Sequence, residues 1–471
     1  MRKKRKELIL MYITGAFMVP HPPLIVPEIG KGQEAAISDT TQAYQTVAKQ
    51  IALLEPETIV VVSPHCAMYA DYFHISPGQG AHGDFKQFRA KQINFDVVYD
   101  TELVKEISAV CRNRHLMAGP LGERDADLDH GTMVPLYFID QVYKGYKLVR
   151  VGLSGLPLTD HYALGQAIKE AAGRLERRTV VIASGDLSHC LKEDGPYGYK
   201  KEGPVYDEQI MNVMGSANFF RLFEFADEFR RNASECGHGA FTIMAGALDC
   251  TDVEAQQLSY QGTFGVGYGV CAYQAAGENC QRNFKEQYEE KERRRLKEQK
   301  SAEDIYVRLA RESLETYVTT GEKLLMPDNL PKELTEHRAG AFVSLKKDGR
   351  LRGCIGTIGP VRENLAAEIL ENAVSAGSRD PRFSPVGAEE LVKLEYSVDV
   401  LGEPQPIGSE QELDARKFGV IVTRGDKRGL LLPNLEGVDT PQQQIAIAKQ
   451  KAGIGPDESV HLKRFEVVRH K

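Results

Sequence analysis

Residues 57–65 read ETIVVVSPH, a run of aliphatic residues that stops at a proline and a histidine. Two further runs have the same form, KLVRVGLSG at 147–155 and RTVVIASGDLSH at 178–189. Near-continuous Val and Ile runs of this length predict strands that are buried on both faces. Helical segments such as 162–177 lie between them. This alternation predicts an α/β domain with a mostly parallel central sheet flanked by helices.

A charged segment divides the chain, whose 471 residues are too many for one ordinary domain. Thirteen of the twenty residues at 281–300 are charged, with little apolar periodicity, which predicts an exposed helix or a linker. We therefore expect an amino-terminal domain at 1–278, a charged linker at 279–300 and a carboxy-terminal domain at 301–471.

The carboxy-terminal part has a different pattern, typical of a smaller α+β domain. Residues 391–401, LVKLEYSVDVL, alternate strictly between apolar and polar side chains and predict a half-buried strand. Residues 363–377 carry an apolar stripe with helical spacing. Residues 419–433 predict two strands joined by a tight polar turn.

Composition excludes several classes of protein. The net charge of −7 argues against a broad nucleic-acid surface. The eight cysteines form no C-x-x-C pair, which argues against a disulfide framework and suits a reducing compartment. The start, MRKKRK and an apolar run, lacks a clean cleavage site and predicts a basic tail before a first strand. We expect a cytoplasmic protein without nucleic-acid or membrane partners.

Histidines follow three of the apolar runs. His21 ends ITGAFMVPHPP, His65 ends IVVVSPH and His189 ends VVIASGDLSH. The carboxyl ends of parallel strands lie along one edge of a sheet, where ligands bind. The neighbouring prolines restrict the backbone beside His21 and His65. We therefore expect these imidazoles to face one crevice and to hold a metal ion, although a lone histidine at a strand end is more often structural.

The segment NASECGHGAF at 232–241 offers a third ligand. If Glu235 joins His21 and His65, the result is the two-histidine, one-carboxylate set that is typical of non-haem Fe(II). Glu235 could equally cap the helix that follows it. His189 would then serve as a general base, with a third-ligand role as the alternative. His130, in ADLDHGTMVPL, could bond substrate or be a buried structural histidine.

Four ordered motifs carry a resemblance to a known family across most of residues 12–275. GAFMVPHPPLIVPEIG, VVVSPH, LDHGTMVPL and SGDLSH resemble class III extradiol ring-cleavage dioxygenases of the protocatechuate 4,5-dioxygenase catalytic-subunit type, and their Memo-like relatives. The resemblance implies metal ligation by His21 and His65, a general base at His189 and a second active-site histidine at His130. Memo-like relatives have a cysteine in the third-ligand region, so Glu235, Cys236 or both could be the ligand.

The resemblance also implies an activity. It predicts an Fe²⁺-dependent oxidoreductase of aromatic compound metabolism that inserts O₂ into a catechol or related small aromatic substrate, with Zn²⁺ as an alternative ion in the isolated protein. The alternative function is that of a Memo-like metal, redox or binding component without ring-cleaving activity. We expect a homo-oligomer in either case.

Residues 300–471 resemble the AMMECR family. The match is carried by LRGCIGTIGP (351–360), SRDPRFSPV (378–386), GLLLPNLEG (429–437) and TPQQQIAIAKQKAGI (440–454). The pairing of the two domains is similar to the AmmeMemoRadiSam group, which implies a radical-SAM protein as a partner. Cys354 could be a nucleophile, but we favour a packing or ligand-lining role because no histidine lies near it in sequence. We expect His74, His82, His115 and His161 at the surface.

Overall fold

A six-stranded sheet forms the centre of the amino-terminal part of the chain, in the order β7-β2-β8-β1-β10-β9. Its strands are β1 (Ile13–Val19), β2 (Thr58–Ser63), β7 (Lys147–Gly152), β8 (Thr179–Ser184), β9 (Thr251–Gln261) and β10 (Tyr268–Glu278). Strands β7, β2, β8 and β1 run parallel, whereas β10 is antiparallel to both its neighbours. The three apolar runs form β2, β7 and β8, so the predicted parallel sheet is confirmed.

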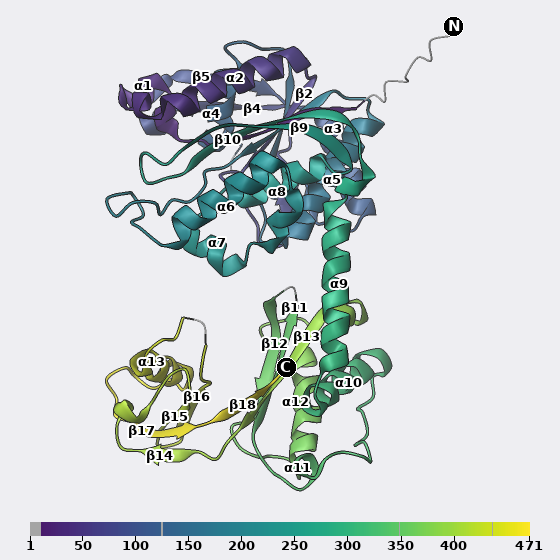
Figure 1. Cartoon of the computed structure of the whole chain (residues 1–471), viewed down its shortest axis with the longest axis vertical. Coiled ribbons are helices and arrows are strands. Elements are labelled where there is room, and N and C mark those ends of the chain that lie inside the picture. The colour runs from purple at the N-terminus through teal and green to yellow at the C-terminus, as the bar shows by residue number, and fades with distance from the viewer. Residues whose placement is uncertain (1–10, 124–125, 348, 436) are drawn as a thin grey trace. The chain divides into compact units, whose positions relative to one another are not determined.

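The computed structural model describes residues 11–123, 126–347, 349–435 and 437–471. It divides the chain into two compact units, residues 1–289 and 290–471 (Figure 1). The boundary falls inside helix α9 (Phe284–Ala302), which the charged segment forms as the exposed-helix alternative predicted. Phe284 and Leu296 are among its few buried side chains. The basic tail predicted at 1–6 lies outside the described residues.

The central sheet is buried on both faces because its aliphatic side chains alternate between two cores. In β2, Val60 and Val62 belong to one core, and Ile59 and Val61 belong to the other. Helices α2 (Ser38–Leu54) and α4 (His130–Ile139) pack in the second core. Helices α5 (Leu158–Arg174), α6 (Glu202–Ser216) and α8 (His238–Ala247) pack in the first. Figure 1 shows these two groups of helices on opposite faces of the sheet.

Shorter elements complete the amino-terminal unit. Its remaining helices are α1 (Pro27–Gly30), α3 (Thr101–Asn113) and α7 (Asp227–Ala233). Strands β3 (Phe73–His74) and β6 (Ala118–Gly119) form a parallel pair. Strands β4 (Gly80–Phe85) and β5 (Ala90–Val98) form an antiparallel hairpin between β2 and α3. The hairpin carries Phe88, whose ring approaches His130 with 5.6 Å between ring centroids.

The carboxy-terminal unit contains two four-stranded sheets, in the orders β12-β11-β13-β18 and β14-β17-β15-β16. Their strands are β11 (Ala341–Lys347), β12 (Arg350–Gly356), β13 (Leu394–Leu401), β14 (Gln405–Ile407), β15 (Gly419–Arg424), β16 (Lys427–Leu431), β17 (His461–Phe465) and β18 (Val467–His470). Its helices are α10 (Ile305–Thr320), α11 (Lys332–Thr335), α12 (Leu365–Ser378) and α13 (Pro441–Lys451). All described pairings are antiparallel, and the smaller α+β fold is confirmed.

The strand predicted over residues 391–401 forms β13 from Leu394 on and departs from the predicted pattern at two positions. Val392 lies in a 3-10 helical turn before the strand and is 67% exposed. Asp399, on the predicted polar face, is buried because Arg469 of β18 donates two hydrogen bonds to its carboxylate, at 2.7 and 2.8 Å. An ion pair with full hydrogen bonding lets a charged group leave water.

Candidate metal centre

Three adjacent parallel strands bring their carboxyl ends together, and a histidine follows each of them. Strands β2, β8 and β1 are neighbours in the sheet, so the segments after Ser63, Ser184 and Val19 start from the same edge. The Nε2 atoms of His21 and His65 lie 3.0 Å apart. Their rings meet edge to face, with centroids 4.7 Å apart. The predicted convergence of these two imidazoles is present in the fold.

Cys236 completes a group that could hold a metal ion. It lies in the turn between α7 and α8, and its Sγ is 3.6 Å from His21 Nε2. The ligand atoms of His21, His65 and Cys236 all lie within 4.8 Å of one another. The backbone N–H of Asp186 donates to Cys236 Sγ at 3.3 Å. The thiol is therefore held beside the loop that follows β8.

Among the described residues, the group of close ligand atoms does not include the Glu235 carboxylate. Its carboxylate accepts a hydrogen bond from the backbone N–H of His238 at 2.7 Å, at the start of α8. It also forms an ion pair with Arg230 at 3.5 Å. Burial raises the pKa of Glu235. Glu235 thus bonds to the first backbone N–H of α8, as its capping alternative expected, whereas Cys236 lies beside the histidines; which of the two binds a metal stays a prediction.

The hydrogen bonds around His21 present its Nε2 lone pair to the group. The Ser184 hydroxyl donates to the Gly131 carbonyl at 2.6 Å, so its oxygen is left to accept a bond from His21 Nδ1, 3.0 Å away. With the proton on Nδ1, the unprotonated Nε2 points toward His65 and Cys236. Bonds of this kind, made by the ring nitrogen that does not bind the ion, set the tautomer of metal-bound histidines.

The donor set fits a transition-metal ion. Zn–N bonds of roughly 2.0 Å and Zn–S bonds of roughly 2.3 Å place tetrahedral ligand atoms about 3.3–3.6 Å apart. The observed separations of 3.0 Å between the two nitrogens and 3.6 Å between nitrogen and sulfur are close to this spacing. Burial lowers the pKa of both His21 and His65, which favours the neutral imidazoles that a metal requires.

A carboxylate lies next to the group. Asp186 accepts a hydrogen bond from the backbone N–H of His21 at 2.8 Å. One of its oxygens is 3.9 Å from His21 Nε2 and 4.0 Å from His189 Nε2. Burial is the main cause of the raised pKa of Asp186. Burial likewise raises the pKa of the Cys236 thiol, an effect that a bound cation would oppose.

His189 has the geometry of an acid–base group. Its Nδ1 lies 2.5 Å from the Ser234 carbonyl, which can only accept, so Nδ1 carries the proton. Nε2 then has a free lone pair and faces Asp186. The side chain is 17% exposed, and the Tyr197 ring lies beside it with centroids 5.1 Å apart. His189 is outside the group of three ligand atoms, and its role as a base stays a prediction.

His130 lies over the metal group, at the first position of α4. Its ring centroid is 4.0 Å from that of His65 and 5.4 Å from that of His21. Burial and the two nearby imidazoles lower the pKa of His130 to about 4. All the histidines predicted for the site therefore gather here, with His130 neutral at physiological pH.

Sequence reasoning missed the polar side chains that hold the histidines, chief among them Asp129. Asp129 caps α4 and accepts hydrogen bonds from Ser63, which precedes His65 by two positions, and from Thr132. The signal was available, because Asp directly before a helical run is a favoured helix-capping residue.

Two histidines expected at the surface are buried. His74 lies on β3, and its Nδ1 is 2.9 Å from the Leu121 carbonyl. His161 faces the core from the first turn of α5, and its ring meets Phe73 edge to face. Both predictions were wrong because each imidazole finds a carbonyl partner, and a paired polar group can be buried. His82 and His115 are exposed, as predicted.

Two motifs of the carboxy-terminal unit meet at Cys354. Its backbone N–H donates to Asp380 at 2.9 Å, and its carbonyl accepts from Arg382 at 3.3 Å. The Ser344 hydroxyl is 3.2 Å from Cys354 Sγ and donates to it. Burial raises the pKa of the thiol. A protonated, hydrogen-bonded thiol supports the packing role over the nucleophilic one.

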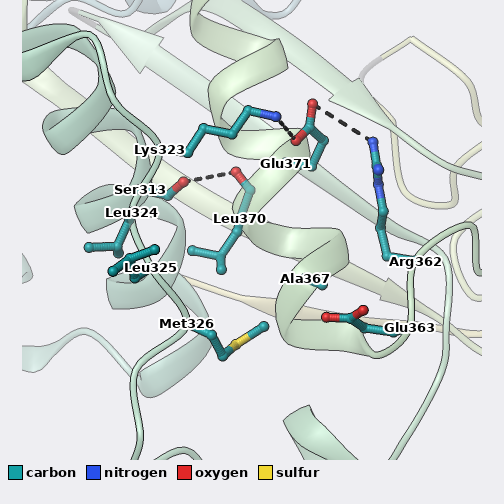
Figure 2. A pocket seen from close by; sticks show the side chains of 10 residues that line it. All are labelled: Ser313, Lys323, Leu324, Leu325, Met326, Arg362, Glu363, Ala367, Leu370 and Glu371. Carbon is teal, nitrogen blue, oxygen red and sulfur yellow. Dashed lines mark hydrogen bonds and ion pairs between the residues drawn. The ribbon is translucent and has the colours of Figure 1, made fainter.

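The same unit contains a cavity of about 320 Å³ between α12 and the segment after α10 (Figure 2). Leu324, Leu325, Met326 and Leu370 form its apolar wall. Lys323 and Arg362 both pair with Glu371 on the opposite side, at 2.6 and 3.8 Å. The cations and the carboxylate therefore neutralise one another.

No helix among the described residues has the length and apolar character needed to cross a bilayer.

Comparisons with known proteins agree with the motifs. Residues 15–271 match the family model described as the catalytic LigB subunit of aromatic ring-opening dioxygenase, and residues 307–470 match the AMMECR1 family. A protein of Clostridium acetobutylicum is 42% identical over 476 residues, covering 98% of this chain and all of that protein. A protein of Thermotoga maritima is 50% identical over 171 residues, covering 36% of this chain and 98% of that protein.

Two of the similar solved structures are an uncharacterized protein from Pyrococcus horikoshii and an uncharacterized protein from Escherichia coli K12. The first has a TM-score of 0.33 and 32% identity, and covers 35% of this chain and 88% of that chain. The second has a TM-score of 0.38 and 14% identity, and covers 55% of this chain and 99% of that chain. The chain belongs to the LigB family of aromatic ring-opening dioxygenases in its amino-terminal unit and to the AMMECR1 family in its carboxy-terminal unit.

Proposed function

We propose that the amino-terminal unit is a metal-dependent oxidoreductase that acts on a small aromatic substrate carrying phenolic hydroxyls, with O₂ as co-substrate. The observation that carries this proposal is the placement of His21, His65 and Cys236 within 4.8 Å of one another, beside the free Nε2 of His189. Membership of the ring-opening dioxygenase family supports the aromatic substrate and the use of O₂.

His21, His65 and Cys236 would hold the ion. A bound metal would lower the pKa of phenolic hydroxyls and bring substrate and O₂ together. Fe²⁺ is our first expectation and Zn²⁺ the alternative, since imidazole suits both ions. A thiolate in place of a carboxylate also favours softer ions such as copper, so the metal has to be measured.

His189 would take a proton from the substrate hydroxyl at Nε2. The Nδ1–H bond to the Ser234 carbonyl holds the ring in the tautomer that a base needs. His130, neutral because burial and the nearby imidazoles lower its pKa to about 4, would donate an N–H bond to developing negative charge on oxygen. The rings of Phe88 and Tyr197 lie next to these two histidines and would contact an aromatic ring.

A second candidate function is favoured by one specific observation. Cys236 stands beside the two histidines where ring-cleaving chemistry on Fe²⁺ is expected to use a carboxylate. The unit would then be a Memo-like redox or binding component of a modification system that includes a radical-SAM protein. Ring cleavage would be absent, although the same three residues would bind metal.

One experiment separates the two functions. The full chain is purified anaerobically, its metal content is measured, and Fe²⁺-loaded protein is given a panel of catechols with O₂. We expect yellow ring-opened products and one O₂ consumed per product, and we expect H189A to lose turnover while it keeps its iron. Iron-loaded protein that consumes no O₂ with any catechol would exclude the dioxygenase and favour the second function.

The homo-oligomer and the radical-SAM partner stay predictions, and each has its own test. A homo-oligomer would be seen as a multiple of the 52.3 kDa chain mass in light scattering. A radical-SAM partner would be seen as a stable complex of the two purified proteins. A monomer, or the absence of complex formation at micromolar concentrations, would contradict the corresponding prediction.

A further inference from the structure

Asp129 is linked by hydrogen bonds to the elements that carry the metal-binding histidines. As the capping residue of α4, its Oδ1 accepts from the backbone N–H of Thr132 at 3.0 Å. Its Oδ2 accepts from the Thr132 hydroxyl at 2.9 Å. Oδ1 also accepts from the Ser63 hydroxyl at 2.5 Å. Both carboxylate oxygens are therefore used, and the first turn of α4 is tied to the end of β2.

The first connection leads to His65. Ser63 is the last residue of β2, and its hydroxyl oxygen accepts from the backbone N–H of His65 at 3.2 Å. Because the hydroxyl proton goes to Asp129, the oxygen is oriented to accept that bond. The hydrogen bond to Ser63 thus fixes the backbone turn that carries His65. The hydrogen bond to Asp129 fixes the orientation of the Ser63 hydroxyl.

The second connection leads to His21. The residue after His130 is Gly131, whose carbonyl accepts from Ser184, the hydroxyl that in turn accepts from His21 Nδ1. A Cβ on Gly131 would lie 2.4 Å from Ser63 Oγ and 3.0 Å from Asp129 Oδ1. Because Gly131 has no side chain, the first turn of α4 can approach both Ser63 and Ser184 this closely. The first turn of α4 therefore holds the Ser184 hydroxyl in the orientation that keeps the proton of His21 on Nδ1.

A buried cation faces the same carboxylate. Arg150 is 1% exposed, and its Nη1 lies 3.9 Å from Asp129 Oδ2. Its guanidinium is held by the Ser76 hydroxyl, to which Nε donates at 2.7 Å, and by the Asp127 carbonyl, to which Nη1 donates at 2.5 Å. A fixed positive charge at this distance attracts the carboxylate that accepts from all three donors.

We propose that Asp129 is the positioning residue of the metal centre: through Ser63 it orients His65, and through Gly131 and Ser184 it holds His21 with Nε2 free. Asp129 does not itself bind the ion. The inference rests on the proposed metal site. Partners of this kind, one step away from the metal ligands, change metal affinity by about 10- to 100-fold when they are removed.

The chain contains a matched control for Asp129. Asp100 caps α3 and accepts from the Leu103 N–H at 3.1 Å. It also accepts from the Thr58 hydroxyl at 2.5 Å, at the opposite end of β2, and pairs with Arg177 at 3.1 Å. Asp100 thus has the same kinds of partners as Asp129, but none of them leads to His21 or His65.

The test uses the full chain, stripped of metal and titrated with Co²⁺, whose visible spectrum reports its ligands. D129A is expected to weaken Co²⁺ binding by about 10- to 100-fold, whereas D100A is expected to stay within about twofold of the wild type. D129N retains an oxygen that can accept from Ser63 and Thr132, and is expected to recover most of the affinity. If D129A does not fold, S63A tests the connection to His65 alone.

A second readout needs no metal. In protein labelled with ¹⁵N-histidine, the ring nitrogen shifts of metal-free wild type are expected to show His21 protonated on Nδ1, and D129A is expected to change the His21 and His65 signals. Wild-type Co²⁺ affinity in D129A, or equal losses in D100A and D129A, would overturn the inference. Wild type that binds no Co²⁺ contradicts the proposed function instead, and unchanged histidine shifts in D129A would then overturn the inference by themselves.

Discussion

The Nε2 atoms of His21 and His65 lie 3.0 Å apart, although 44 positions separate the two residues in the chain. They meet because β1 and β2 flank β8 in the parallel sheet, so the segments after both strands leave the same edge. The distance between them in sequence is spanned by α1 and α2, which return the chain to the start of β2. Without an ion the two nitrogens are within hydrogen-bond distance, and under the proposed function they would bind the same metal ion.

The two adjacent candidates for the third ligand should behave differently when each is replaced by Ala. C236A removes a donor atom from the metal group and is expected to lower Zn²⁺ affinity by at least about 100-fold with little change in folding. E235A is expected to retain Zn²⁺ and to lose about 1–3 kcal/mol of stability, because the N–H of His238 loses its side-chain acceptor and Arg230 loses one of its two carboxylate partners. Zn²⁺ titration and thermal melting of both variants check this. Metal loss in E235A alone would restore the carboxylate as the ligand.

Stability should fall with rising pH because of Asp207. Burial raises the pKa of this carboxyl to about 7 in the folded protein, although the Ser188 N–H and the Tyr260 hydroxyl donate to it. Its ordinary pKa is 3.8. The folded state therefore holds a proton that the unfolded state has lost between pH 3.8 and about 7, and stability decreases as pH rises through this window.

The variant D207N tests this pH dependence, since its neutral amide oxygen can accept from the Ser188 N–H while its NH₂ donates to the Tyr260 hydroxyl oxygen. The difference in unfolding free energy between wild type and D207N is expected to change by up to about 1.4 kcal/mol per pH unit within the window. Denaturant unfolding at pH 5, 6, 7 and 8 measures this difference in free energy. Hydrogen exchange of the amides near Ser188 at the same pH values gives a second measurement. Parallel pH profiles for the two proteins would contradict the raised pKa.

The contact between helices α5 and α8 depends on two glycines. A Cβ on Gly165 would lie 2.0 Å from the Ile243 carbonyl oxygen, and one on Gly246 would lie 2.0 Å from the Tyr162 carbonyl oxygen. G246A is therefore expected to destabilise the amino-terminal unit by about 1–3 kcal/mol or more, because the backbones must separate. Gly173, near the end of α5, provides the control G173A, because its added Cβ would meet a neighbouring ring only at an ordinary contact distance of 3.8 Å. Equal melting temperatures for the two variants would contradict this account of the packing.

The thiol of Cys354 should be slow to react. It is hydrogen-bonded by Ser344, and burial raises its pKa, so little thiolate is present at pH 8. Cys280 is exposed and is expected to react with iodoacetamide at least about tenfold faster. Mass spectrometry of peptides after timed alkylation measures both rates. Faster modification of Cys354 than of Cys280 would instead support a nucleophilic role.

The sequence by itself determined the sheet and the edge at which the site forms. Apolar runs such as 57–65 are typical of strands in a parallel sheet that is covered by helices on both faces. The segments that leave parallel strands all start from one edge of the sheet. It also pointed to His21, His65 and His189, because each follows an apolar run, and to His130 through the motif LDHGTMVPL, although their roles stay predictions.

Only the tertiary structure shows that Glu235 and Cys236 point to different partners, while the identity of the third ligand stays a prediction. Side-chain directions within a turn depend on which partners come near, and here the Glu235 carboxylate contacts Arg230 and the N–H of His238 while Cys236 Sγ faces His21. The contacts that link Asp129 to the site could not be predicted for the same reason: the partners of its carboxylate, Ser63 and Arg150, come from distant strands that the fold alone brings together.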